Sequence, residues 1–274
     1  MEPEGDMVFL TGASGFLGGH ILRALLAEGF AVRALTRRGS RPLPALAGCT
    51  PIPGDLSRPG NLIRAMEGCR YLMHVAALYS FSPGRRRAIW ATNVRGSAGL
   101  LATAGQAGIE RAVVTSSSAT VGPGSMDRPA TEENWASDDD ASPYHRSKIW
   151  QERAVLAARV PSILLLPTAP VGPGDWKPTP TGKMIVDFMR GRMFATLSGG
   201  LNLVPVEDVA RAHVLALRHG RPHERYVLGG QNLEIGQIWR TLAAITGRKA
   251  PARRIPYGLA FSLGWLDDRR CRIM

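Results

Sequence analysis

The stretch TGASGFLG at residues 11–18 decides the fold, because its glycines follow the spacing G-x-x-G-x-x-G between an apolar strand and an apolar helical pattern. Gly12 suits a tight turn, Gly15 lets the backbone approach a pyrophosphate, and Gly18 lets the helix pack against the strand. The helix N-terminus adds free N–H groups and a partial positive charge. The pattern predicts a cradle for a dinucleotide, whose expected contacts are Gly12, Ser14, Gly15, Phe16, Leu17 and Gly18.

Apolar runs of strand length continue outward from this cradle, with helical patterns between them. They lie at residues 8–10, 31–36, 71–75, 112–115 and 163–166. Strands that alternate with helices indicate a parallel sheet. The runs are nearly continuous in apolar character, as expected when helices cover both faces of the sheet. The predicted fold class is therefore α/β, a doubly wound parallel-sheet Rossmann fold.

A change of composition after Pro167 predicts a second region. Four prolines with interspersed glycines follow between residues 170 and 180, a pattern more typical of a functional loop than of a spacer. We expect an NAD(P)-binding Rossmann domain at residues 1–166. Residues 167–274 should form a smaller substrate-facing lobe, interleaved with the last Rossmann elements.

Composition excludes several classes of protein. The net charge of +12 comes mostly from dispersed arginines without interleaved aromatic residues, so a nucleic-acid partner is not expected. No apolar run is long enough to cross a bilayer, and the N-terminus lacks the pattern of a signal peptide. The three cysteines are scattered and lack metal-ligand spacing. We expect a cytoplasmic protein without an integral membrane segment or a bound metal.

The end of the second strand bears on cofactor choice. An acidic residue there binds the ribose 2′-hydroxyl of NAD, whereas this chain has Arg37 and Arg38. Arginines at this point would pair with a 2′-phosphate, which favours NADP and leaves NAD possible. Asp55 and Leu56 follow the third strand and are placed to touch the adenine. The alternative for Asp55 is to cap the segment that begins near Ser57.

Tyr144 and Lys148 form the candidate proton-transfer pair. Their i, i+4 spacing puts both on one face of a helix. A free tyrosine has a pKa of about 10, and a nearby ammonium would lower that pKa by stabilising the phenolate. Alone, the spacing fits a solvated helix face equally well. A serine cluster at the end of the preceding strand, residues 116–118, favours the catalytic interpretation, because strand ends of a doubly wound sheet line one crevice.

Taken together, these motifs resemble the extended short-chain dehydrogenase/reductases. The resemblance rests on residues 11–18, 54–56, 75–77, 93–96 and 115–117 with the segment 144–148, in the order and approximate spacing of that family. It implies that Ser117, or Ser118 one register away, is the catalytic serine. It further implies that Asn93 steadies the active-site helix, that Ala76 and Ala77 run along the nicotinamide ribose, and that Thr168 passes the nicotinamide amide.

A narrower likeness lies in residues 167–175, 177–182 and 202–210, which resemble hopanoid-associated sugar epimerases, close to dihydroflavonol-4-reductase-like enzymes. It implies an NAD(P)-dependent sugar epimerase or oxidoreductase. The alternatives are an NADPH-dependent ketone reductase and a non-catalytic, NAD(P)-binding redox sensor. Ser118 and Ala119 stand where dehydratases of the family have an Asp-Glu pair, so elimination of water is not expected.

The resemblance also has implications for the partners of the protein and for its C-terminal lobe. The expected partner is a small-molecule substrate, a sugar or a ketone, and a homodimer is common in the family. Family members usually extend further than the polar tail at residues 267–274. We therefore expect the C-terminal lobe to be incomplete.

Overall fold

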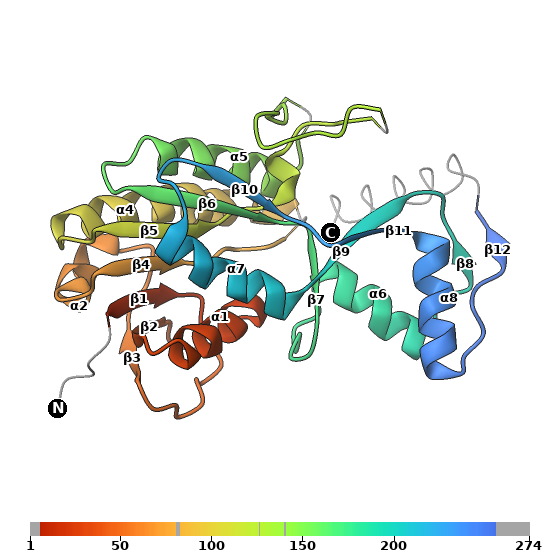
Figure 1. Cartoon of the computed structure of the whole chain (residues 1–274), viewed down its shortest axis with the longest axis horizontal. Helices are drawn as coiled ribbons and strands as arrows, with labels where there is room; N and C mark the ends of the chain where they lie inside the picture. The colour runs from red at the N-terminus through yellow and green to blue at the C-terminus, as the bar shows by residue number, and fades with distance from the viewer. Residues whose placement is uncertain (1–5, 81–82, 126, 140, 256–274) are drawn as a thin grey trace. The chain divides into compact units, whose positions relative to one another are not determined.

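The computed structural model describes residues 6–80, 83–125, 127–139 and 141–255 of the chain. The polar tail at residues 267–274 lies outside this range. Two compact units are present. The first comprises the described residues up to Pro167 together with Val206–Leu228, and the second comprises Thr168–Pro205 and the described residues from Gly229 onward. The described chain thus leaves the first unit, returns to it at Val206 and re-enters the second unit at Gly229 (Figure 1).

The first unit is built on a seven-stranded sheet in the order β10-β6-β5-β4-β1-β2-β3, and every pairing in it is parallel. This confirms the predicted doubly wound Rossmann fold. The order reverses between β1 and β4, and the carboxyl ends of parallel strands open a crevice at such a switch point. The strands are β1 (Met7–Thr11), β2 (Ala31–Thr36), β3 (Cys49–Pro53), β4 (Tyr71–His74), β5 (Arg111–Thr115), β6 (Ser162–Pro167) and β10 (Arg225–Leu228).

Helices cover both faces of this sheet. The α-helices of the unit are α1 (Phe16–Ala27), α2 (Ile63–Met66), α3 (Arg86–Trp90), α4 (Ser97–Gln106), α5 (Pro143–Leu156) and α7 (Val206–His219). Short turns of other helix types lie at η1 (Pro59–Leu62), η2 (Pro83–Arg85), η3 (Ala91–Gly96) and η4 (Ser118–Thr120), of which η3 is a π-helix.

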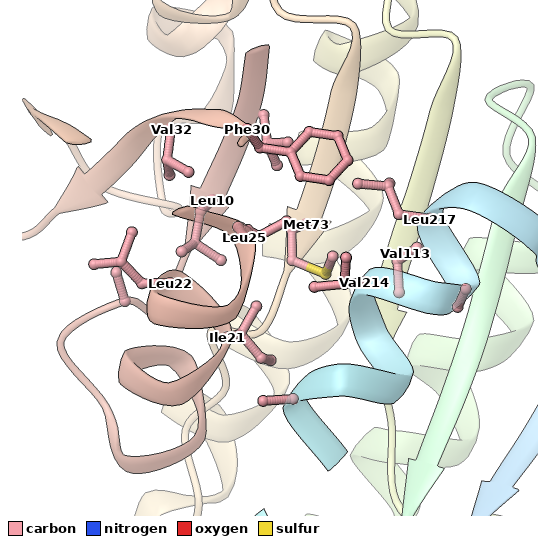
Figure 2. Close-up of a cluster of buried hydrophobic side chains, with 14 of the residues drawn as sticks. Leu10, Ile21, Leu22, Leu25, Phe30, Val32, Met73, Val113, Val214 and Leu217 are labelled. Carbon is pink, nitrogen blue, oxygen red and sulfur yellow. The ribbon is translucent and has the colours of Figure 1, made fainter. Parts of the chain in front are cut away.

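Alternate strand residues enter two hydrophobic cores. Leu10 points to the core under α1 and α7, whereas its neighbour Phe9 points to the core under α4 and α5. Figure 2 shows the first of these cores, in which Ile21 of α1 and Val214 of α7 meet strand side chains such as Met73. Because both faces are buried there, the central strands are nearly continuous in apolar character, whereas the edge strand β3 is half exposed.

The second unit has its own small core. A three-stranded sheet, β11-β9-β7, joins β7 (Ala169–Val171), β9 (Gly200–Pro205) and β11 (Gln231–Glu234), and a two-stranded pairing joins β8 (Ala195–Thr196) to β12 (Arg253–Arg254). Helices α6 (Pro180–Met189) and α8 (Ile235–Thr246) pack together through Phe188 and Trp239, whose rings stack with centroids 5.5 Å apart. In the described part of the chain, no helix is both long enough and apolar enough to cross a membrane.

Candidate functional site

The turn between β1 and α1 has two positions, Gly12 and Gly18, that have room only for glycine. Gly12 has a φ of +84°, and a Cβ on it would lie 2.7 Å from the amide nitrogen of Ala76. A Cβ on Gly18 would lie 2.0 Å from the carbonyl oxygen of Gly12. Helix α1 begins directly after Gly15, with no acidic residue in its first turn. The turn therefore fits a dinucleotide pyrophosphate, which the N-terminal N–H groups of α1 would hold; Ser14, Phe16 and Leu17 lie in the same segment.

The arginines that follow β2 are exposed. Arg37 lines a cavity of about 760 Å³ between the end of β2, the segment 40–47 and β3. Within the residues that the structure describes, the guanidinium groups of Arg37 and Arg38 form no ion pair. Both charges are therefore available to an anionic group.

Asp55 and Leu56 have structural contacts of their own. The carboxylate of Asp55 accepts a hydrogen bond from the amide nitrogen of Ser57 at 2.8 Å, which is the capping role considered as the alternative for this residue. Leu56 is buried in the core beneath α4 and α5. Contact of either residue with adenine stays a prediction.

Tyr144 is the second residue of helix α5, which begins at Pro143. Ser142 caps the helix, its hydroxyl accepting from the amide nitrogen of His145 at 3.3 Å. The Tyr144 side chain is hydrogen-bonded to Ser117, and the Ser117 hydroxyl also accepts from the amide nitrogen of Ala119 at 3.2 Å. The structure thus brings Ser117, from the turn after β5, to the tyrosine. Ser118 begins the next helical turn, η4.

The pKa of Tyr144 differs from the expectation. Burial raises this pKa above its ordinary value, the neighbouring Tyr79 raises it further, and the hydrogen bond from Ser117 opposes both. Lys148 is buried as well, with 2% of its surface exposed, and its ammonium group donates to the carbonyl oxygen of Thr115 and to Gln151. Burial lowers the pKa of Lys148 to about 8, although Glu152 opposes this. In this structure the tyrosine is a neutral acid at pH 7.

Asn93 ties two segments together from the π-helical turn η3. Its side chain accepts from the amide nitrogen of Leu78 at 2.7 Å and donates to the carbonyl oxygen of Leu78 at 3.1 Å. It also donates to the hydroxyl of Ser147 at 3.0 Å, which in turn donates to the carbonyl oxygen of Tyr144. The asparagine is therefore bonded to α5 one turn beyond the tyrosine. π-Helical turns are frequent at functional sites.

The remaining predicted contacts lie at strand ends. The amide nitrogen of Ala76 donates to the hydroxyl of Thr11 at 3.3 Å, and Ala77 beside it is exposed. Thr168 belongs to the second unit, where its hydroxyl donates to the side chain of Asn202 at 2.8 Å.

Five buried polar residues near the site were not singled out from the sequence as functional. They are His74, Ser97, Gln151, Glu152 and Arg225. Gln151 and Glu152 follow Lys148 by three and four positions, so the helix face of the lysine continues with polar residues that should have indicated a buried polar network. His74 and His213 are completely buried in the core; burial lowers the pKa of His74 to about 3 and that of His213 to about 4.

The fold and this arrangement define an NAD(P)-dependent enzyme of the extended short-chain dehydrogenase/reductase type. The chain belongs to the NAD dependent epimerase/dehydratase family, whose model matches residues 8–229.

Named relatives agree with this family. The chain is 39% identical to a putative dihydroflavonol 4-reductase of Synechocystis sp., over 96% of this chain and 79% of that protein. It is 36% identical to sterol demethylase protein B of Methylococcus capsulatus, over 94% of this chain and 80% of that protein. The solved structure of gox2253 is 36% identical and superimposes with a TM-score of 0.83, over 96% of this chain and 82% of that one.

Proposed function

We propose that the protein moves a hydride at a carbinol or carbonyl carbon of a small molecule, with Ser117, Tyr144 and Lys148 as its catalytic residues. The observation that carries the proposal is the hydrogen bond between Tyr144 and Ser117, with Lys148 buried one helical turn further along α5. A nicotinamide held at the glycine turn would supply or accept the hydride.

Each residue has a separate task in this proposal. Tyr144 is protonated at neutral pH, because burial raises its pKa, so it can donate a proton to a carbonyl oxygen that becomes an alcohol. The Ser117 hydrogen bond favours the phenolate, and it therefore assists the tyrosine as the proton leaves. Lys148 supplies a positive charge on the same helix face, and Asn93 holds that helix through Ser147.

The test is the variant Tyr144→Phe, which keeps the ring and removes the acid. We expect kcat to fall by about 10²- to 10⁴-fold, the range for loss of a general acid, with little change in cofactor affinity. Tyr226→Phe is the matched control, because its hydroxyl is bonded to Arg221 and to none of the proposed catalytic residues. A Tyr144→Phe enzyme with more than about a tenth of the original kcat would contradict the assignment. If the original protein binds cofactor but turns over no substrate, the redox-sensor alternative gains instead.

Two outcomes of the hydride step are candidates. The resemblance of the Pro-rich segment favours a sugar epimerase associated with hopanoid biosynthesis, in which the same cofactor returns its hydride in each cycle. The name of one relative, a dihydroflavonol 4-reductase, favours net reduction of a ketone to an alcohol, and the name of the other, a sterol demethylase protein, favours a sterol-like substrate. We place the ketone reductase first, because both of these relatives match nearly the whole chain.

An absorbance assay separates these outcomes. A dihydroflavonol, a 3-ketosteroid and UDP-glucose are each incubated with enzyme and added NADPH. Steady stoichiometric loss of the reduced cofactor with a ketone supports the reductase. Interconversion of the sugar without net change of cofactor supports the epimerase.

NADP is the proposed cofactor because Arg37 and Arg38 are exposed at the end of β2 and form no ion pair with a carboxylate in the described part of the chain. Replacing both by alanine should weaken NADP binding by about 2 to 4 kcal/mol, because a 2′-phosphate would lose charge-assisted hydrogen bonds. NAD binding should hardly change. Arg64→Ala, at an exposed position of α2, is the control, and equal weakening of both cofactors would contradict the proposal.

A further inference from the structure

Lys148 is unusual in its own sequence. The chain has only four lysines beside thirty arginines, and the other three, Lys177, Lys183 and Lys249, are exposed. Lys148 alone is buried, and the two bonds of its ammonium run to neutral oxygens. One oxygen is the carbonyl of Thr115 at 2.9 Å, and the other is the side-chain oxygen of Gln151 at 2.8 Å. An ammonium has three donors, so one N–H is left without a partner among the residues that the structure describes.

The orientation of the Gln151 amide follows from counting donors. The hydroxyl of Ser97 donates its one hydrogen to the carbonyl oxygen of Asn93 at 2.7 Å. Its oxygen must therefore accept from its other two neighbours, which are Nε2 of His74 at 2.7 Å and Nε2 of Gln151 at 2.9 Å. The amide nitrogen of Gln151 is thus held by Ser97, and the amide oxygen faces Lys148.

The same count of hydrogen-bond donors extends to the glycine turn after β1. Because Nε2 of His74 carries the hydrogen, Nδ1 is an acceptor and receives the hydroxyl of Thr11 at 2.7 Å. Thr11 ends β1 next to Gly12, and its oxygen also accepts from the amide of Ala76. A continuous series of hydrogen-bonded neutral groups therefore connects Thr11 to the ammonium of Lys148. It runs through His74, Ser97 and Gln151, and we call it the neutral chain.

We propose that Gln151 is a positioning residue for Lys148: its amide, oriented by Ser97 and His74, holds the ammonium against β5 with one N–H free for the reacting groups. This inference rests on the proposed function, which gives Lys148 its part in proton transfer. A neutral partner has a specific consequence here, because it binds the ammonium without fixing its charge.

The charged and titratable groups around Lys148 leave its ammonium able to gain and lose a proton. His74 faces it from β4, and the low pKa of this histidine keeps the ring neutral. Tyr144 and Glu152 lie on its own helix, and Glu152 is bonded to Ser116, Thr120 and Arg225. His213 of α7 contacts Thr115, also as a neutral ring. Of these groups, Glu152 alone stabilises the ammonium.

The experiment measures the titration of Lys148 directly in cofactor-free protein. Four lysines make a ¹³C-lysine spectrum simple, and Lys148→Met identifies the resonance of the buried one. Gln151→Met removes the acceptor and should lower the titration midpoint of Lys148 by about one pH unit. Gln151→Glu adds a negative charge and should raise the midpoint by about one unit or more. Gln106→Met, at an exposed position of α4, is the matched control and should leave it unchanged.

Activity gives the second readout. The alkaline limb of the kcat profile should move with the midpoint in each variant, while the KM for cofactor changes less than twofold. If Gln151→Met does not fold, Ser97→Ala is the second variant. It removes the hydroxyl that holds the Gln151 amide nitrogen, and it should also lower the titration midpoint of Lys148. Unchanged midpoints in both Gln151 variants would overturn this inference alone. A protein that shows these midpoints but no turnover would overturn the proposed function alone.

Discussion

Gln151 and Glu152 are consecutive residues of α5, and both are completely buried, yet they belong to different polar networks. Gln151 is part of the neutral chain, in which a single charge, that of Lys148, has neutral oxygens as its two bonded partners. Glu152 forms a buried ion pair with Arg225 at 2.8 Å. The difference shows how one helix can hold a charge that titrates beside a pair of charges that compensate each other.

The ion pair closes the turn that contains Ser117. The Glu152 carboxylate accepts from the hydroxyls of Ser116 and Thr120, and the guanidinium of Arg225 donates to the carbonyl oxygen of Thr120 at 3.1 Å. Arg225 also lies 3.8 Å from the ring centre of Trp135. We call Glu152, Arg225, Ser116 and Thr120 the ion-pair cluster. Its residues surround the turn and meet Ser117 at its carbonyl oxygen, which lies 2.8 Å from the Thr120 hydroxyl, so the cluster positions the backbone that carries the serine side chain.

The largest expected effect comes from breaking this cluster. Arg225→Met should lower the free energy of unfolding by about 3 to 5 kcal/mol, because it leaves the Glu152 carboxylate buried without its cation. Urea denaturation at pH 7 measures the change. Arg211→Met is the matched control: its partner Asp208 lies at 3.6 Å on an exposed helix face, where such pairs contribute less than about 1 kcal/mol.

A double variant sharpens the same point. Replacing Glu152 by leucine together with Arg225→Met removes both charges and should recover much of the lost stability, since the cost lies in the unpaired charge. If the double variant is as unstable as the sum of the single variants, the hydrogen bonds to the 116–120 turn matter more than the charges.

The neutral chain should show itself as a dependence of stability on pH. The pKa of Lys148 is about 8 in the folded protein and 10.5 as its ordinary value, so the unfolded chain binds more protons between these limits. Stability from this residue should therefore rise with pH above 8, by up to about 1.4 kcal/mol per unit and about 3 kcal/mol in total. Lys148→Met should abolish the rise, and denaturation at pH 7 to 10 measures it. If Lys148→Met left the slope of the unfolding free energy against pH unaltered, the titration of buried Lys148 would not be its cause.

The smallest expected effect is at the far end of the neutral chain. Thr11→Val keeps the shape of the side chain but removes the donor to Nδ1 of His74, which should cost about 1 to 2 kcal/mol because a buried acceptor loses its partner. Thr103→Val is the control, since its hydroxyl only donates to the carbonyl oxygen of Gly99 within α4. Equal thermal stability of the two variants would contradict the hydrogen bond from Thr11 to His74 as a stabilising part of the neutral chain.

The sheet and the cradle could be predicted because their signals are local. The apolar strand runs and the glycine spacing at residues 11–18 each lie within one short segment, and the close approach of Gly18 to Gly12 spans six positions. The short strands of the second unit were not predicted. β7, β8 and β12 have two or three residues each, too few to show an alternation, and β7 also lies in the Pro-rich segment before α6.

By itself, the sequence determined the parallel α/β fold, the glycine turn and the spacing of Tyr144 and Lys148, because these depend on chain stiffness, helical period and residues close in sequence. Tertiary structure decided the partners of those residues. Glu152 meets Arg225 across 73 positions, and His74 meets Ser97 across 23. It also decided the acidity of the site, since burial, which no local pattern specifies, raises the pKa of Tyr144 and lowers that of Lys148.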